Sequence, residues 1–237
     1  QSKLPAFSTE SMLQYFRTSS TALGKLTSPE ACAVLLVLVL IVRNIKRLIM
    51  PVFRTIGRET GRMTHGEEWL KLNEERITKF GEYVYRLVFH TSISVFGLSY
   101  FLRQAWWARE GLSFVGTRAL FTGFPNQPIE PGMIWYYLIQ AAYNMDAMIS
   151  LLEISFDVKL QNPVSQGKIR FPVFVRWSKT VRGDFGEMFV HHIATNLLIF
   201  GSSHCRLNRT GSMVFLIHDV SDVPVDMSKL ANFLKWK

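Results

Sequence analysis

Residues 185–200 read FGEMFVHHIATNLLIF, an apolar stretch that contains two adjacent histidines, His191 and His192. The next apolar stretch carries the run HDVSD, which holds Asp219 and Asp222. At the centre of a membrane helix each ionised acid costs about 2.5 to 3.5 kcal/mol, so the two aspartates together cost about 5 to 7 kcal/mol. Each apolar neighbour returns only about 0.3 to 0.6 kcal/mol. These titratable groups therefore predict a polar site inside a helix bundle, with the acids turned away from lipid.

The composition favours a membrane protein with several spans. The 237 residues are 48% apolar and 13% aromatic, yet the chain carries a net charge of +9. Long apolar windows alternate with basic segments, a pattern that a soluble domain does not need. We therefore expect an all-α fold, a polytopic transmembrane helix bundle. The two cysteines, Cys32 and Cys205, lie in or near expected spans and indicate no disulfide framework.

Five segments are long or apolar enough to be expected as spans. The first is the shortest, with twelve apolar residues, and it needs snorkelling by the basic side chains that follow it to reach across. Residues 1–30, rich in Ser and Thr, are expected to lie outside the membrane. The expected spans are residues 31–42, 81–102, 133–156, 185–203 and 211–226.

The basic residues orient these spans. Residues 43–80 and 157–184 are expected to be basic loops, and they alternate with segments poor in basic residues, 103–132 and 204–210. The positive-inside rule places the two basic loops in the cytosol. The histidines then lie near the cytosolic end of the fourth span, and the site opens toward the cytosolic leaflet.

Helical geometry sorts the titratable side chains. Neighbours on a helix are about 100° apart, so His191 and His192 point in different directions. Asp219 and Asp222 are three residues apart and project together, with His218 four residues before Asp222. One helix thus offers imidazoles and the next offers carboxylates. This combination suits general base catalysis, in which a carboxylate orients an imidazole.

Other interpretations of the same residues remain open. The histidines can be core residues, with the acids paired to Arg182 or Lys229. A metal site is disfavoured, because adjacent helical histidines diverge and no His-x-x-x-His pair completes a ligand set. A proton or ion relay in a transporter predicts paired spans broken by Gly or Pro, a pattern we do not find.

Five further charged residues have weaker assignments. Asp146, Glu153 and Arg86 lie near expected span ends, where pairing or snorkelling explains them, and they receive no role. The basic loops are topogenic, and Lys179 and Arg182 are in addition candidates for phosphate contacts.

A longer ordered motif surrounds the site residues. From Arg182 the chain reads RGDFGEMFVHHIAT, followed by RTGS from Arg209, HDVSD from His218 and SK from Ser228. This series resembles the signature of the longevity-assurance family of ceramide synthases, the enzymatic branch of the TLC-domain membrane proteins. Upstream, KFGE from Lys79 and the tyrosines near residue 136 look like the earlier spans of the same family. The resemblance covers residues 79–237.

The resemblance implies transfer of a fatty acyl group from acyl-CoA to the amine of a sphingoid long-chain base, giving ceramide or dihydroceramide in the endoplasmic reticulum membrane. His191, His192, Asp219 and Asp222 match the residues that this family needs for activity. No cofactor and no metal is implied. The implied partners are fatty acyl-CoA, a sphingoid base and the lipid bilayer, with no nucleic acid; the oligomeric state, including a homodimer or heterodimer, stays open.

The resemblance also divides the chain. Residues 1–30 form the segment outside the membrane, residues 31–78 the first span with its basic loop, and residues 79–237 a TLC domain that ends before the family's last spans. The Pro-containing stretch 161–181 stands where the family usually has a short linker.

Two chemical routes and two rival functions are left open. A histidine either deprotonates the amine as a base or is itself acylated by the thioester first. A non-catalytic TLC-type relative, working in lipid sensing or translocation, keeps the spans without needing the histidine and aspartate pairs. A different membrane acyltransferase fits poorly, because such enzymes commonly rely on one histidine with a distant asparagine or aspartate.

Overall fold

The computed structural model describes residues 26, 28–108, 118–160, 164–165, 168–169, 173–177 and 185–234. Five long helices dominate this part of the chain: α2 (Pro29–His65), α4 (Glu74–Phe101), α7 (Pro131–Ser155), α8 (Phe185–His204) and α9 (Asn208–Leu234). Three short helices join them: α3 (Glu67–Leu72), α5 (Ala105–Ala108) and α6 (Arg118–Phe121). Four short strands follow α7: β1 (Phe156–Leu160), β2 (Val164–Ser165), β3 (Lys168–Ile169) and β4 (Val173–Trp177).

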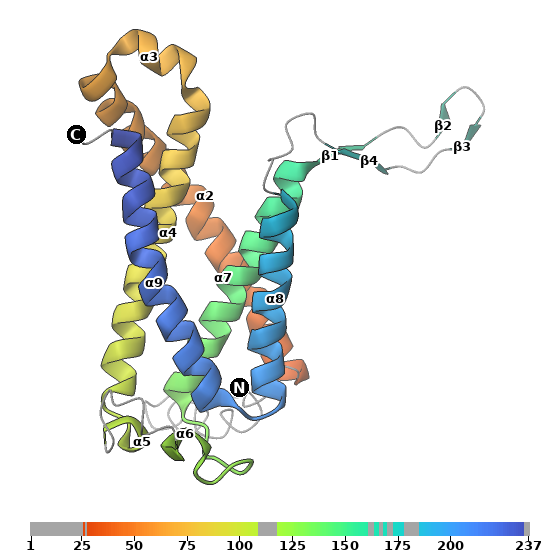
Figure 1. Cartoon of the computed structure of the whole chain (residues 1–237). Helices are drawn as coiled ribbons and strands as arrows, with labels where there is room; N and C mark the ends of the chain where they lie inside the picture. The colour runs from red at the N-terminus through yellow and green to blue at the C-terminus, as the bar shows by residue number, and fades with distance from the viewer. Residues whose placement is uncertain are drawn as a thin grey trace, which may run out of the picture.

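The long helices form two pairs held together by a fifth helix (Figure 1). Helix α9 packs along α4, and α8 packs along α7, while α2 packs against both α4 and α7. Helices α8 and α9 meet at the turn that joins them and separate toward their other ends. The two histidines of the motif therefore lie on α8, in one helix pair, and the two aspartates lie on α9, in the other pair.

The core lies mainly around α7. Tyr136, Leu138 and Ala141 on this helix are fully or almost fully buried, and Phe101 of α4 and Ile199 of α8 pack into the same apolar cluster. The small residues Ala141 and Ala142 of α7 are fully buried, so neighbouring helices approach it closely there. This central helix supplies polar side chains to the site described below.

The expected all-α class is confirmed for the bundle. Each of the five expected spans coincides with one long helix, and the boundaries of α7 and α8 differ from the expected ones by only a few residues. Helix α9 begins three residues before its expected start and continues to Leu234. In the described part of the chain, no helix combines the length and the apolar character that a membrane crossing requires.

The basic segment 43–80 is helical, so the prediction of a loop there is wrong. Helix α2 continues through it to His65, and α3 and the first turns of α4 follow. Residues 43–65 include Pro51, Gly57 and Gly61, which disfavour a helix, so local propensity alone does not explain this extension. The extension also has a packing surface, because Gly57 lies directly against the ring of Phe80 on α4. Tertiary packing of this face stabilises the basic part of α2 as a helix.

Two β-hairpins occupy part of the stretch that follows α7, and they were not predicted. Strands β1 and β4 pair antiparallel, with Phe156 opposite Trp177, Asp157 opposite Arg176 and Leu160 opposite Val173. Strand β2 pairs with β3 in the same way. The sequence FDVKL of β1 alternates apolar and charged residues, which is the period of a strand. This hairpin extends from the end of α7 away from the bundle (Figure 1).

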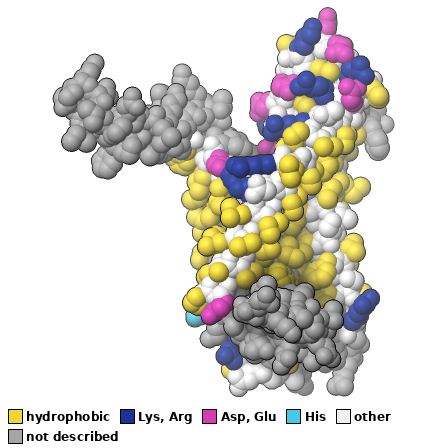
Figure 2. All heavy atoms as spheres, turned by 180° about the vertical axis from the view of Figure 1, so that it is seen from behind, with side chains coloured by type: hydrophobic (Ala, Val, Ile, Leu, Met, Phe, Trp, Pro, Cys, Tyr) yellow, Lys and Arg dark blue, Asp and Glu magenta, His cyan; other side chains and the backbone are white. Residues whose placement is uncertain are grey.

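Charged and apolar side chains are separated on the surface (Figure 2). Lys, Arg, Asp and Glu gather at the end of the bundle that carries α3, and apolar side chains cover much of the face below it. Many large apolar side chains on the outside of the bundle are exposed, among them Leu36, Val37, Leu40, Ile41, Leu48, Val52, Val88, Val95, Val190, Leu197, Ile217 and Val225.

Candidate functional site

Asp219 on α9 is a buried carboxylate held by two side chains of α7. Only 4% of the residue is exposed. Its Oδ2 accepts a hydrogen bond from the Tyr136 hydroxyl at 3.2 Å and another from the Gln140 amide Nε2. A buried acid without such donors is strongly destabilising, so Tyr136 and Gln140 make this position tolerable.

The other two acids of α9 surround a histidine of α4. His90 Nδ1 lies 3.0 Å from Asp226 Oδ2, and both side chains are buried. His90 Nε2 lies 3.7 Å from Asp222 Oδ2. A neutral imidazole carries one N–H, so it donates to only one of the two carboxylates, whereas the protonated ring donates to both. His90 therefore links α4 to two turns of α9.

Asp222 also holds a second imidazole on its own helix. His218 Nδ1 lies 3.3 Å from Asp222 Oδ2, one helical turn away. The His218 ring in turn stacks on His191 of α8, with centroids 5.7 Å apart and an interplanar angle of 22°. His191 thus contacts the acidic cluster of α9 through His218. The His191 side chain remains exposed.

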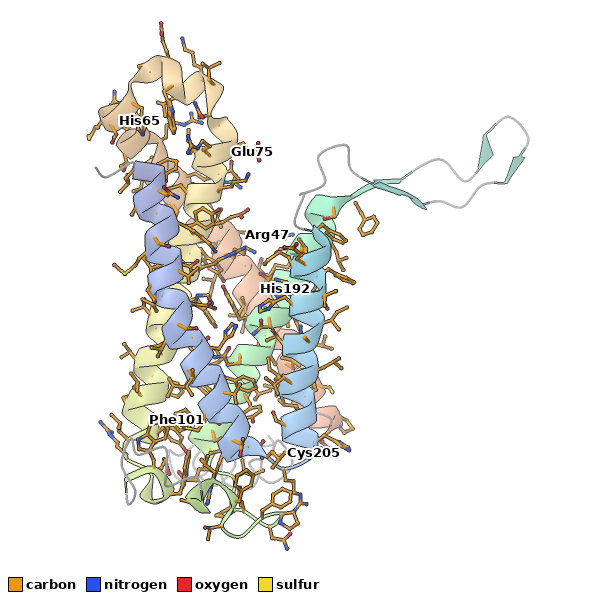
Figure 3. All side chains as sticks on the ribbon, viewed as in Figure 1. Arg47, His65, Glu75, Phe101, His192 and Cys205 are labelled. Carbon is orange, nitrogen blue, oxygen red and sulfur yellow. The ribbon has the colours of Figure 1, made fainter. Side chains whose placement is uncertain are left out.

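His192 points to a different part of the bundle. Its ring is 5.5 Å from that of His191 but inclined by 64°. It lines a cavity of about 370 Å³ between α2, α4, α7 and α8. Its Nδ1 is buried and has no hydrogen-bond partner among the described residues. In Figure 3, Arg47 of α2 and His192 of α8 lie at similar heights along the bundle.

The cavity is markedly cationic. Five basic and three acidic side chains line it, together with Tyr85 and Tyr143. Arg43 pairs with Asp146 at 3.1 Å and with Glu153, and Lys46 lies 3.3 Å from Asp146. The pKa of the Arg43 guanidinium is raised above its ordinary value, chiefly by the hydrogen bond to Glu153. The remaining charged lining residues are Arg47, Arg54, Arg86 and Glu82.

A smaller pocket of about 60 Å³ lies beside the acids. It is lined by side chains of four helices, including His90 of α4, Gln140 of α7, Thr195 of α8 and Asp219 of α9. Tyr143 of α7 lines both this pocket and the cationic cavity. The polar groups of the bundle therefore form one connected region between the two helix pairs.

The four predicted site residues thus lie in one region, but with partners that the sequence did not indicate. Within the described residues, no carboxylate of α9 is in hydrogen-bonding contact with His191 or His192. The direct imidazole partners of Asp222 are His90 and His218. Helices α8 and α9 diverge from their shared turn, which explains why contact between them at this level is through the stacked rings. The functional roles of the four residues stay predictions.

The alternative partners named from the sequence are also placed. Lys229 lies 3.8 Å from Asp226 and, within the described residues, forms no ion pair with Asp219 or Asp222. The expected pairing of Asp146 and Glu153 with basic side chains is confirmed. Lys179 and Arg182 lie outside the described residues. Among the described His, Cys, Asp and Glu side chains, no group of three is arranged to hold a metal ion.

Sequence reasoning missed four members of the site: His90, Tyr136, Gln140 and Asp226. Two signals were available, because Tyr136 and Gln140 are four residues apart, as are Asp222 and Asp226, so each pair shares a helix face. No local signal indicates that His90 faces α9, since 136 positions separate it from Asp226.

The chain is similar to known proteins that carry a TLC domain. Residues 171–237, which include α8 and α9 with all four predicted site residues, match the family model of the TLC domain. Among curated proteins, the chain is 29% identical over 160 residues to human ceramide synthase 4, covering 67% of this chain and 32% of that protein. It is 29% identical over 161 residues to human ceramide synthase 5 (68% and 33%) and 26% identical over 163 residues to ceramide synthase LOH1 of Arabidopsis thaliana (69% and 44%).

These matches confirm the resemblance that the motifs indicated. The chain is similar to the ceramide synthases and carries the TLC-domain match at its C-terminal end. It spans about a third to less than half of the length of these three relatives.

The two cysteines, Cys32 and Cys205, are free, as the sequence led us to expect.

Proposed function

We propose that this protein is a ceramide synthase, which transfers a fatty acyl group from acyl-CoA to the amine of a sphingoid long-chain base. The observation that carries the proposal is the contact of His191 with His218, whose ring is held by Asp222 next to the buried Asp219. The Asp222 carboxylate orients the His218 imidazole, as in a general base, and the exposed His191 imidazole stacks on this ring. The similarity to the ceramide synthases supports the choice of reaction.

The chemistry requires a base. The acceptor amine resembles a lysine side chain with a pKa of about 10, so it arrives protonated and cannot attack. A histidine of the pair removes one proton from the ammonium and releases it to water. The neutral amine nitrogen then bonds to the thioester carbonyl carbon, the same histidine takes the second proton from this nitrogen, and the C–S bond breaks. The thiolate of CoA then takes up the proton from the imidazolium. Neither a metal nor a prosthetic group takes part in these steps.

The proposal includes a position in the endoplasmic reticulum membrane. It is supported by the large apolar side chains that are exposed on the outside of α2, α4, α8 and α9 among the described residues, and that lipid would cover. The polar groups of the site face one another between the helices, as membrane helices require. In this proposal the charged end of the bundle, with α3, lies in the cytosol. Acyl-CoA is available on that side, and its charged CoA group cannot cross lipid.

Substitution of the four predicted site residues tests the proposed function. Purified protein with His191→Ala, His192→Ala, Asp219→Ala or Asp222→Ala is mixed with acyl-CoA and sphinganine, and ceramide is measured by mass spectrometry. We expect each variant to lose at least about 100-fold in turnover, the lower range for acid–base groups. His204→Ala, an exposed histidine at the other end of α8, is the matched control and should keep its activity.

Two outcomes contradict the proposal. Near-normal turnover in all four variants removes these residues from the chemistry. A wild-type protein that is folded, binds lipid and acylates none of a panel of sphingoid bases supports the rival function of a non-catalytic TLC-type protein. Unfolding temperatures of all variants, with Asp219→Asn added as a milder change, separate loss of activity from loss of fold.

A second measurement separates the two chemical routes. The protein is mixed with acyl-CoA in the absence of the amine, quenched rapidly and analysed by mass spectrometry. Acyl mass retained on a peptide that contains His191 and His192 indicates a covalent acyl-imidazole. Its absence indicates direct attack by the amine.

A further inference from the structure

The cationic cavity between α2, α4, α7 and α8 has charges that the bundle itself does not neutralise. Within the described part of the chain, Arg47, Arg54 and Arg86 line the cavity and have no acid within ion-pair distance. The acids Asp146 and Glu153 are already engaged by Arg43 and Lys46. Like charges that converge on one cavity repel each other unless an anion lies between them.

The basic side chains of the cavity indicate which kind of anion it binds. Four of the five basic side chains are arginines, three from α2 and one from α4, which packs against α2. Arg86 is half-buried, whereas Arg47 and Arg54 are exposed. The planar guanidinium donates two parallel hydrogen bonds to a phosphate. A volume of about 370 Å³ is within the range of small-molecule sites. The lining therefore fits a ligand that carries phosphate groups.

The cavity also reaches the proposed reaction site. His192 forms part of its wall, and the buried Nδ1 of this ring has no partner among the described residues. The adjacent His191 carries the contact with His218. A ligand with phosphates near the arginines of α2 and α4 and a reactive group at α8 would therefore extend from the cationic part of the cavity to His192.

We propose that this cavity binds the phosphate groups of the acyl donor, with Arg47, Arg54 and Arg86 as the phosphate-binding residues. The inference rests on the proposed function and adds to it the place and orientation of the donor. Glu82 also lines the cavity. Its carboxylate repels the same phosphates, so it lowers the affinity that the arginines provide.

Binding of free coenzyme A tests this site without any acyl transfer. The purified protein is placed in nanodiscs of phosphatidylcholine, and affinity is measured by calorimetry for coenzyme A, 3′-dephospho-coenzyme A and pantetheine. We expect affinity to fall in that order, because each step removes phosphate. Arg47→Gln, Arg54→Gln and Arg86→Gln should each weaken coenzyme A binding about tenfold, as expected for loss of one charge-assisted contact.

Two further variants control the result. Arg58→Gln is the matched control, because Arg58 is an exposed arginine on α2 that pairs with Glu74 and does not line the cavity. Its affinity for coenzyme A should equal that of the wild type. Glu82→Gln should bind coenzyme A more tightly, a change in the opposite sense that a damaged fold does not produce.

Three results decide the inference. Affinity for coenzyme A that is the same in the three cavity-arginine variants and in Arg58→Gln overturns it. Binding of phosphatidylserine that depends on these arginines, with coenzyme A unaffected, also overturns it and assigns the cavity to a lipid headgroup. Arginine-dependent binding of coenzyme A in a protein that transfers no acyl group supports the phosphate site and contradicts the proposed function instead.

Discussion

Two buried aspartates of α9 depend on partners from two other helices. Asp219 is held by Tyr136 and Gln140 of α7, and Asp226 is held by His90 of α4. A buried carboxylate that loses its partner keeps its full desolvation cost, whereas removal of both members of a pair is much less costly. At the scale of single residues, the pair of His90 and Asp226 is therefore the most direct test of the arrangement.

We expect His90→Phe to destabilise the protein by about 1 to 3 kcal/mol, because it leaves Asp226 buried without its imidazole. Adding Asp226→Asn in the same chain should recover part of this loss, since a neutral amide costs less to bury than a carboxylate. The measurement is the thermal unfolding midpoint of the purified protein in detergent.

His204→Phe controls for the loss of a histidine as such, because His204 is exposed at the end of α8. Its unfolding midpoint should stay close to that of the wild type. The single variant Asp226→Asn is measured as well. If the effects of His90→Phe and Asp226→Asn on stability simply add in the double variant, the two residues do not interact and the contact is wrong.

At the scale of the elements, the start of α9 depends on close approach to α7 and α8. A Cβ at Gly211 would collide with the Tyr137 hydroxyl and approach Ser202 Oγ to 2.7 Å. These two groups are hydrogen-bonded to each other at 3.1 Å, and the Tyr137 hydroxyl also donates to the Asn208 carbonyl at the first residue of α9. The absence of a side chain at Gly211 thus allows three helices to meet where α9 begins.

Gly211→Ala should therefore lower stability by about 1 to 3 kcal/mol, the usual cost of overpacking. Gly201→Ala, on the neighbouring helix α8, is the matched control because a Cβ there meets no atom within 4 Å. This control should be neutral or more stable by about 0.5 to 1 kcal/mol, as alanine favours a helix over glycine. Equal effects of the two changes in thermal unfolding would refute the close contact.

At the scale of the whole molecule, the two basic segments of the sequence reach the same end of the bundle. The end of α2 with α3, and the end of α7 with its hairpin, both lie there (Figure 1). The turn between α8 and α9, with the exposed Cys205, lies at the opposite end. The proposed membrane orientation therefore places α3 and Cys205 on opposite sides of the bilayer.

Labelling of two cysteines, one at each end of the bundle, tests this orientation. In a Cys32→Ser background, Leu72→Cys on α3 introduces a thiol at a position where the native side chain is 85% exposed. In sealed endoplasmic reticulum vesicles with their cytosolic side outward, a membrane-impermeant maleimide should label this thiol, while Cys205 should react only after detergent is added. Labelling of Cys205 in intact vesicles would contradict the orientation, and labelling of both sites in detergent is the control.

The hydrophobic pattern was sufficient to predict the five long helices, since a helix of apolar residues needs only local information. Boundaries were predicted well where a polar turn follows the apolar stretch, as after α8, and poorly for α2. There the helix continues for 23 residues beyond the expected end at residue 42, through a basic segment whose helicity depends on packing against α4. The β1–β4 hairpin has a period-two pattern in β1, a local signal that extends over only five residues.

By itself, the amino-acid sequence determined the helical class, the place of each long helix along the chain, and the presence of histidines and aspartates on two successive helices. Only the tertiary structure decided that Asp219 pairs with α7, that His90 lies between two acids of α9, and that five basic side chains converge on one cavity. Helical periodicity states which residues share a face, but not which helix that face meets. That choice depends on how the helices pack, because the partners are separated by 79 to 136 positions in the chain.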